Sequence, residues 1–345
     1  MTFQPFIRQA SLRVPTDAAG VALLDYLAGR FPYHNRDAWR QQIATGKVLC
    51  NDQLVTQEHV LTRGDVIVYQ PEPRPEPPVD FTAELLYQDD DLLVLAKSSN
   101  LPCHPAGCFF NHTLWAMLAC PERQRLPLPF NTLPALATPH FVTRLDRETS
   151  GVIVIARNPA AAKRTARLLQ TPAAAKQYLV IIENQNHFPD ALTANGWLAT
   201  DTASAVRKKR SFYQDKPHDR AAETAVTDFL CLAVHGDLAL LTATLHTGRT
   251  HQIRATLAAS GFPVVGDKIY GCDETIYLRF VAGQLTPDDG KRLRLPSQAL
   301  HAWKTTLPLP RSPGPTLTFT APPPLTWRQH HDLQPLLAKA GLLDD

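Results

Sequence analysis

Two short polar segments carry most of the side chains that could do chemistry. The first, residues 143–151, reads TRLDRETSG and places four charged residues directly before the apolar run 152–155. A catalytic group is well positioned on a loop that a rigid sheet holds, and Gly151 permits a close approach of the backbone. This segment, which contains Asp146, is therefore a candidate catalytic loop. The alternative is a salt-bridged turn with a purely structural role.

The second polar segment, residues 245–254, reads LHTGRTHQIR and follows a predicted strand. An arginine beside a buried carboxylate keeps that group ionised and oriented through paired hydrogen bonds, which makes Arg254 the expected partner of Asp146. His246 and His251 suggest a metal site. They are five residues apart, however, so they do not share a helix face, and no carboxylate or thiol stands close by in the sequence. Contacts with substrate or backbone are the favoured interpretation, and no metal is expected.

Strand-forming runs surround both polar segments. They are rich in Val, Ile and Leu, and they occur at 85–87, 92–95, 152–155, 178–182 and 238–245. Irregular spacers, rather than helices of constant length, separate these runs, which disfavours a doubly wound parallel sheet. The sequence predicts an α+β fold with a mixed, largely antiparallel central sheet and flanking helices. One helix is expected at about 159–170, where Lys163, Arg164 and Arg167 form a basic side that faces phosphates or simply solvent.

Residues 10–72 have the signals of a small separate α/β module. Asp17 is expected to cap one helix that carries Leu24 and Leu27, and Asn35 to cap a second helix that Gly46 closes. Short strands are then expected at 48–50, 54–55 and 66–69, with turns at 51–52 and 63–65. A helix pair with a small sheet is the predicted arrangement.

Two groups of basic residues are candidates for contact with a nucleic acid. Arg36 and Arg40 lie beside Trp39 on the second predicted helix, where they could face a phosphate backbone or only solvent. The other group is a predicted loop followed closely by Phe212 and Tyr213, and its members are Arg207, Lys208, Lys209 and Arg210. Such a loop is suited to meeting phosphates and stacking a base, and an exposed charged loop without a ligand is the alternative.

A proline-rich segment divides the chain. Residues 71–78 read PEPRPEPP, which fits a polyproline spacer better than a helix or a central strand. We therefore expect a module at 10–72, a linker at 73–82, a large domain at 83–322 that carries both polar segments, and a C-terminal helical tail at 323–345. The length of 345 residues agrees with about two domains.

Composition and missing motifs limit the function classes. The net charge is only +3, so binding of a nucleic acid cannot be argued from the total charge. The sequence lacks the glycine fingerprints of dinucleotide and nucleotide-triphosphate sites, the zinc-protease helix motif and the serine nucleophile elbow. Because the sequence contains no signal peptide and no apolar run of membrane-spanning length, we expect a cytoplasmic protein.

The six cysteines are scattered along the chain, and we expect reduced thiols. One local cluster suggests a zinc site, but its spacing matches no familiar pairing of ligands; it consists of Cys103, His104, Cys108 and His112. Ordinary loop and core roles are favoured for these four residues.

Four motifs in a fixed order resemble the RluA-type pseudouridine synthases. They are TRLDRETSGVIVIAR, KQYLVI, HTGRTHQIRATLAASGFPVVGDKIYG and QALHAWK, and the resemblance covers roughly residues 82–310. Residues 10–72 resemble, more loosely, the alpha-L RNA-binding motif of ribosomal proteins and RNA-modifying enzymes. The resemblance implies the pseudouridine synthase fold and an enzyme that isomerises uridine to pseudouridine in structured RNA. Ribosomal RNA is the favoured substrate, and transfer RNA is the alternative.

By this resemblance, Asp146 is the catalytic aspartate and Arg254 is the basic residue that pairs with it. Tyr178 corresponds to the active-site tyrosine that packs on the target base, and Arg144 to the arginine that fills the space of the displaced base. Further contacts with the RNA or the base are expected from Arg147, Thr247, Arg249, His251 and Gln252. The reaction oxidises and consumes nothing, so no cofactor and no nucleotide partner are expected. The enzyme is expected to be a monomer that binds no membrane.

The sequence departs from the family pattern at two places. Thr143 stands where histidine is usual, and Ser98 ends an Ala-Lys-Ser turn where Asn-Lys-Pro is usual. Both positions flank the pocket, so they bear on RNA preference more than on activity. A non-catalytic RNA-binding protein is disfavoured by the joint presence of Asp146, Tyr178 and Arg254. A zinc deaminase is disfavoured because its His-x-Glu and Cys-x-x-Cys elements are absent from the sequence.

Overall fold

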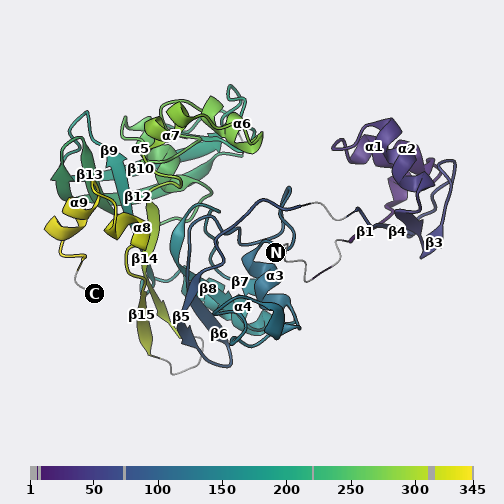
Figure 1. The fold of residues 1–345 in the computed structure, drawn as a ribbon, viewed down its shortest axis with the longest axis horizontal. Coiled ribbons are helices and arrows are strands. Elements are labelled where there is room, and N and C mark those ends of the chain that lie inside the picture. The colour runs from purple at the N-terminus through teal and green to yellow at the C-terminus, as the bar shows by residue number, and fades with distance from the viewer. Residues whose placement is uncertain (1–5, 7–8, 73–74, 220, 310–314, 344–345) are drawn as a thin grey trace. The chain divides into compact units, whose positions relative to one another are not determined.

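The structure is a computed structural model of the chain, and it describes every residue except 1–5, 7–8, 73–74, 220, 310–314 and 344–345. The chain forms two compact units (Figure 1). One comprises Met1–Pro77 with Ala106–Asn111, and the other comprises Pro78–Pro105 with His112–Asp345. Parts of three predicted segments lie outside the described residues, namely 73–74 of the linker, 220 and 310–314 of the large domain and 344–345 of the tail.

The smaller unit combines two helices with a four-stranded antiparallel sheet of order β1-β4-β2-β3. The strands are β1 (Ala10–Arg13), β2 (Val48–Cys50), β3 (Gln53–Leu54) and β4 (Val66–Tyr69). A 3₁₀ turn, η1 (Thr16–Ala18), precedes the helices α1 (Leu23–Arg30) and α2 (Arg36–Ala44). The buried side chains of Leu27, Trp39 and Ile67 belong to one apolar core that joins the helices to the sheet.

The ends of α2 follow the sequence signals, whereas the start of α1 does not. The side chain of Asn35 accepts a hydrogen bond from the backbone N–H of Ala38 at 2.8 Å, and Gly46 has a φ of +71° just after the helix. The prediction that Asp17 caps the first helix is wrong. Asp17 lies in the separate turn η1, Gly20 breaks the chain direction with a φ of +87°, and no side chain caps α1.

A mixed sheet of 11 strands is the frame of the larger unit (Figure 1). Its main path is β11-β10-β12-β13-β9-β14-β8-β6-β5, with β15 on β14 and β7 on β8. The strands are β5 (Ala83–Gln88), β6 (Leu92–Lys97), β7 (His140–Phe141), β8 (Ser150–Ala156), β9 (Ala175–Glu183), β10 (Ala191–Thr200), β11 (Arg210–Tyr213), β12 (Glu223–His235), β13 (Leu238–Leu245), β14 (Leu300–Pro308) and β15 (Thr316–Thr320). Among the described strands only the β14–β8 ladder is parallel, which confirms the predicted, largely antiparallel α+β fold.

Short helices flank this sheet. They are α3 (Leu114–Ala119), η2 (Arg123–Arg125), α4 (Pro159–Leu168), α5 (Gln252–Ala259), α6 (Thr275–Val281), α7 (Pro287–Leu293), α8 (Leu325–Arg328) and α9 (Gln334–Lys339). The helix α4 packs on β7 and β8, and α9 packs on β12 and β13 (Figure 1). Trp327, Leu336 and Leu337 bury their side chains in the main core of the sheet. None of the helices in the described residues has the length and apolar character that a membrane crossing requires.

The strand registers bring distant parts of the sequence into one row across the sheet. Gly151 of β8 pairs with Ala302 of β14, Ala302 pairs with Tyr178 of β9, and Tyr178 pairs with Ala243 of β13. The row requires glycine at position 151, because φ is +107° there and a Cβ atom would lie 2.2 Å from the carbonyl oxygen of Ala302. The loop before β8 and the end of β13 are thus positioned on either side of Tyr178.

Candidate active site

Asp146 lies in the loop between β7 and β8, and hydrogen bonds from several segments fix this loop. The backbone N–H of Thr149 donates to the carbonyl oxygen of Asp146 at 3.1 Å, and the side chain of Gln298 donates to the Thr149 hydroxyl at 2.6 Å. The buried ammonium group of Lys97 donates to the carbonyl oxygen of Arg147 at 3.2 Å. The backbone that carries the candidate carboxylate is therefore held in place at Asp146 and over the three residues that follow it.

Arg254 joins Asp146 to a second carboxylate. Its Nη1 donates to Oδ2 of Asp146 at 2.7 Å, while its Nε and Nη2 donate to the two carboxylate oxygens of Asp267 at 2.6 and 2.8 Å. The side chains of Arg254 and Asp267 are 5% and 0% exposed, whereas that of Asp146 remains 30% exposed. The arginine is thus fixed by a buried bidentate partner and directs its remaining donor at a carboxylate that is still accessible.

Asp267 is a site residue that sequence reasoning missed. Its Oδ1 also accepts hydrogen bonds from the backbone N–H groups of Ile269 and Tyr270 at 2.9 and 3.0 Å, so its buried charge has a full set of partners. One signal was available in the sequence. Gly266 stands directly before it, with a φ of +75° and a Cβ position only 2.3 Å from the carbonyl oxygen of Ser297, so the backbone at this point needs glycine.

These charges determine the protonation states at the centre of the site. Burial raises the pKa of Asp146, but the positive charge and hydrogen bond of Arg254 outweigh burial and lower this pKa to about 2. The pKa of Asp267 is lowered against the effect of burial by the same guanidinium. The pKa of Arg254 is raised, because its two carboxylates outweigh the cost of its burial. Asp146 is therefore an ionised carboxylate at neutral pH.

Asp146 opens into a cleft that residues of both polar segments line. Tyr178 reaches this cleft from β9, and the exposed Arg144 reaches it from the loop before β8. Burial and the negative charge of Asp146 both raise the pKa of Tyr178, so the phenol keeps its proton. The structure thus brings together Asp146, Tyr178, Arg254 and Arg144 around one space.

Comparison with known proteins identifies the family of the chain. Residues 91–259 match the family model described as RNA pseudouridylate synthase. The chain is 33% identical over 305 residues to an uncharacterized RNA pseudouridine synthase of Chlorobaculum parvum, which covers 87% of this chain and 89% of that protein. It is also 32% identical over 269 residues to the ribosomal large subunit pseudouridine synthase D of Xylella fastidiosa, which covers 77% of this chain and 75% of that protein. The chain belongs to the RNA pseudouridine synthase family.

A solved structure has the same fold. The human RNA pseudouridylate synthase domain containing 1 aligns with a TM-score of 0.52 at 20% identity, over 76% of this chain and 90% of that chain. At this identity the likeness concerns the fold alone. The sequence relatives confirm the resemblance to the RluA-type enzymes and show that the protein is an RNA pseudouridine synthase, an isomerase with an RNA substrate.

In this pseudouridine synthase, Gln252 holds the second polar segment in its shape. Its Oε1 accepts hydrogen bonds from the Thr247 hydroxyl at 2.9 Å and from the backbone N–H of Arg249 at 3.0 Å, and its Nε2 donates to the Thr227 hydroxyl at 2.9 Å. Arg249, His251 and Gln252 line the cleft, and the side chain of Arg249 is 39% exposed. Arg249 and His251 can therefore meet a ligand, while Thr247 and Gln252 are engaged within the protein.

Arg144 and Arg147 flank Asp146 but have different surroundings. Arg147 forms an ion pair with Glu148 at 3.1 Å, and its guanidinium carbon lies 4.6 Å from the ring centre of Phe280. It is not among the described residues that line the cleft, whereas Arg144 is. The structure therefore brings Arg144 to the cleft beside Asp146 and gives Arg147 partners outside it.

The two predicted basic groups lie in the two different units, and each has its own partners. Arg36 and Arg40 are exposed and form surface ion pairs with aspartates of the smaller unit. Arg207 and Lys208 are exposed, whereas Lys209 and Arg210 are half-buried and pair with glutamates at 2.7 and 2.9 Å. The run is also not a loop throughout, as the sequence had suggested, because Arg210 begins β11.

The sequence motifs that suggested a metal do not form a cluster in the described part of the chain. Cys103, His104, Cys108 and His112 are not among the groups of side chains close enough to hold an ion, and neither are His246 and His251. His246 instead lies 2.6 Å from Asp228 on the surface. The groups that are close enough, from other parts of the chain, are Cys50 with His59 and Asp65, and His330 with His331 and Asp332.

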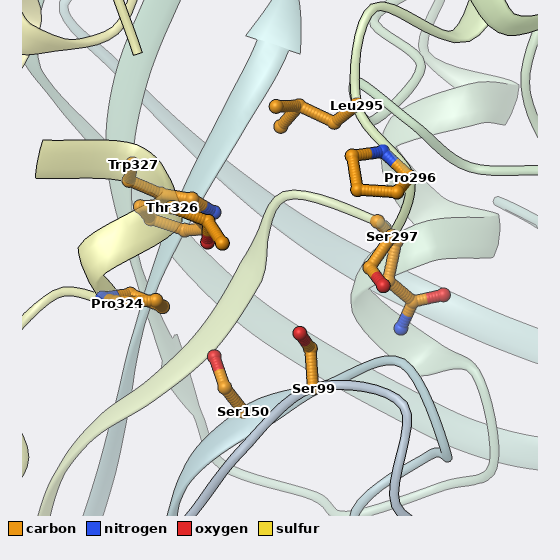
Figure 2. A pocket seen from close by; sticks show the side chains of 9 residues that line it. Ser99, Ser150, Leu295, Pro296, Ser297, Pro324, Thr326 and Trp327 are labelled. Carbon is orange, nitrogen blue, oxygen red and sulfur yellow. The ribbon is translucent and has the colours of Figure 1, made fainter. Parts of the chain in front are cut away.

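A second pocket, shown in Figure 2, lies beside the start of β8. The Ser150 hydroxyl donates to Nδ1 of His301 at 2.8 Å, and Nε2 of His301 donates to the carbonyl oxygen of Ala321 at 3.0 Å. Burial lowers the pKa of His301 to about 4, so its ring is neutral. A serine beside a histidine can act as a nucleophile, but here both are buried and connect β8 to β14 at the paired positions 150 and 301, which indicates a structural role.

Proposed function

We propose that Asp146 performs the isomerisation on a uridine that is turned out of the RNA into the cleft beside Tyr178. The observation that supports this most is the hydrogen-bonded series Asp146–Arg254–Asp267. Only one of its two carboxylates is accessible, and that carboxylate is ionised and faces the cleft.

The residue types suit the chemistry. Isomerisation breaks the bond between the sugar and the base nitrogen, turns the uracil and rejoins it through carbon, so a charged carboxylate that attacks or deprotonates can start it. Extruding a stacked base costs about a few kcal/mol. Tyr178 offers a ring on which the uracil can stack, and Arg144 is an exposed cation that can occupy the vacated space in the RNA.

Asp146→Asn tests the proposal, because it removes the charge and changes the volume little. We expect the formation of pseudouridine to fall by at least about 10⁴-fold while RNA binding is retained. The exposed Asp190→Asn is a matched control, in which the same change should leave the rate as it is. If the purified Asp146→Asn variant still formed pseudouridine at a rate near that of the parent, another group would have to be the catalyst.

We further propose that the substrate is structured RNA, with ribosomal RNA favoured. Two relatives of the chain are named as ribosomal large subunit pseudouridine synthase D, in Neisseria meningitidis and Xylella fastidiosa, and another is named as a mitochondrial tRNA pseudouridine(32) synthase, in Saccharomyces cerevisiae. Mapping pseudouridine in RNA from cells with and without the gene distinguishes the two. Loss of a site in ribosomal RNA is the expected result, and loss of a site only in transfer RNA would overturn this preference.

The smaller unit is proposed to bind RNA through α2, as the alpha-L resemblance suggests. Arg36 and Arg40 are exposed on this helix, and their ion pairs with aspartates are of the surface kind that contributes only about 0–1 kcal/mol. A phosphate group can therefore replace these partners at little cost.

Since the reaction consumes nothing, we also expect the monomeric enzyme to work without a cofactor, so that activity should survive dialysis against a chelator.

A further inference from the structure

His251 lies at the N-cap of α5 in a backbone conformation that few residues adopt. Its φ and ψ are +59° and +17°, in the left-handed region, and its side chain is only 6% exposed. A buried non-glycine residue in this region is held there by its surroundings, and such positions cluster at functional sites. The ring packs edge-on against Tyr270, with the two ring centres 5.6 Å apart.

The hydrogen bonds around Tyr270 determine which nitrogen of His251 carries the proton. The backbone N–H of Arg210 donates to the Tyr270 hydroxyl oxygen at 2.9 Å, and this oxygen lies 2.9 Å from Nδ1 of His251. If Nδ1 carried the proton, the hydroxyl would accept twice and its own hydrogen would have no acceptor among the described residues. Leaving a buried donor unpaired costs about 1–3 kcal/mol. The hydroxyl therefore donates to Nδ1, and the proton of the imidazole is on Nε2.

The Nε2–H group of His251 faces the catalytic centre. Nε2 lies 3.9 Å from Oδ1 of Asp146, which is too far for a hydrogen bond, and His251 lines the cleft. The charged groups that act on the ring are Asp146, Arg254, Asp267 and Lys208. Burial and the positive charge of Arg254 lower the pKa of His251 to about 4, because they outweigh the two carboxylates, so the ring is neutral at physiological pH.

We propose that the Arg210–Tyr270 hydrogen bonds hold His251 as its neutral Nε2–H form, and that this N–H donates to a carbonyl oxygen of the uracil in the cleft. The second half of the inference rests on the proposed function, because the acceptor is the extruded base. A neutral donor suits this position. An imidazolium would instead form a second ion pair with Asp146 and hold back the charge that the reaction needs. His251 thus contacts the substrate, and Tyr270 is a positioning residue that acts through it.

The first experiment needs no RNA and therefore stands apart from the proposed function. In full-length enzyme with ¹⁵N-labelled histidine, two-bond ¹H–¹⁵N correlation spectra identify the protonated nitrogen of each ring. We expect His251, assigned by its loss in His251→Gln, to show the Nε2–H form unchanged from about pH 8 to about pH 5. In Tyr270→Phe, Nδ1 loses its donor, so the Nδ1–H form or a raised pKa should appear. A parent ring that is protonated on Nδ1, or that titrates near pH 6.5, would overturn the inference.

The second experiment tests whether the Nε2–H group of His251 donates a hydrogen bond to the substrate. His251→Gln keeps an amide donor near the position of Nε2, while His251→Leu removes it at similar volume and the same backbone strain. We expect kcat/KM for pseudouridine formation to fall roughly 5–30-fold in the leucine variant and clearly less in the glutamine variant, as for one lost hydrogen bond. Equal losses in the two variants would refute the donor role. If both enzymes keep full activity while Asp146→Asn abolishes it, the donor role fails and the proposed function stands.

Discussion

At the scale of single residues, the site depends on how the Arg254 guanidinium divides its donors. Two of its nitrogens are committed to Asp267, which is completely buried, and the third holds Asp146, which is partly exposed. Burying three charges is tolerated only because they neutralise and hydrogen-bond one another, and removing one member of such a set leaves the others uncompensated. The arrangement therefore links the stability of the fold to the ionisation of Asp146, the proposed catalytic carboxylate.

Arg254→Met tests this link through pH dependence. In the parent, the pKa of Asp146 is about 2 instead of 3.8, so its ionisation contributes stability that is complete above pH 3.8 and is lost as the pH falls toward 2. Without the guanidinium, burial raises this pKa, and we expect the free energy of unfolding at neutral pH to fall by about 3–5 kcal/mol. The acid limb of the activity should also move to higher pH.

Urea unfolding and a pH–rate profile measure both effects. Arg254→Lys is the matched control, because it keeps the charge but not the planar set of donors, and it should lose less stability than the methionine variant. An unchanged acid limb in Arg254→Met would show that Arg254 does not control the ionisation of Asp146.

Residue types alone were enough to predict the central pair but not its third member. Asp146 and Arg254 stand in dense polar segments beside strands, and a buried carboxylate in such a loop calls for a guanidinium. Asp267 stands in a short loop where the adjacent Gly266 was the single signal, and a glycine alone does not indicate that the next residue is a buried partner of Arg254. The hydrogen bonds from Arg210 through Tyr270 to His251 were equally out of reach, because they join three segments whose meeting depends on strand pairing.

At the scale of elements, the row Gly151–Ala302–Tyr178–Ala243 connects β8, β14, β9 and β13 next to the loop that carries Asp146. Position 151 is where the chain passes from that loop into the sheet. Its glycine lets the backbone of β8 approach β14 more closely than any side chain would allow, which sets the position of Asp146 relative to Tyr178.

Gly151→Ala should therefore destabilise the protein strongly. The positive φ alone costs about 1–3 kcal/mol for a residue with a side chain, and the contact of the new Cβ with the Ala302 backbone adds to this cost. Gly236→Ala provides a matched control, because Gly236 also has a positive φ of 58° but its Cβ would meet nothing within 4 Å. Chemical unfolding of both variants separates the cost of the positive φ from the cost of the contact with Ala302. Equal losses in the free energy of unfolding would show that the close approach of β8 to β14 is unimportant.

The sequence predicted five strands of the large sheet, namely β5, β6, β8, β9 and β13, because long apolar and β-branched segments have few other conformations available in a folded chain. It did not predict β7, β10, β11, β12, β14 or β15, and it did not provide the registers. A register depends on which strands become neighbours in space, and the pattern within one strand leaves this open. The prediction that Asp17 caps a helix was wrong for a similar reason, because an aspartate is equally suited to a short turn.

At the scale of the whole molecule, chemistry and RNA affinity are expected to reside in different units. The residues around Asp146 all belong to the larger unit, while Arg36 and Arg40 belong to the smaller one. Contacts between basic side chains and phosphates release counterions, so they affect affinity and its salt dependence without entering the reaction.

The double variant Arg36→Ala with Arg40→Ala should therefore bind RNA more weakly and with less salt dependence. If both arginines contact phosphates, the slope of log K against log salt falls in magnitude by about 1–2, and kcat is nearly unchanged. Binding measured between about 50 and 200 mM salt gives the slope. The exposed Lys291→Ala, on α7 of the larger unit, is the comparison, and equal slopes in the two variants would show that α2 does not meet phosphates.

The position of β14 between β8 and β9 has a consequence for folding during translation. Its residues leave the ribosome about 150 positions after Ser150, yet β8 and β9 meet only through it. During translation, the loop that carries Asp146 and the strand β9 that carries Tyr178 are synthesised before β14, the strand that joins them. A nascent chain that has not reached residue 300 therefore lacks the strand that places Asp146 beside Tyr178, and we expect it to be inactive.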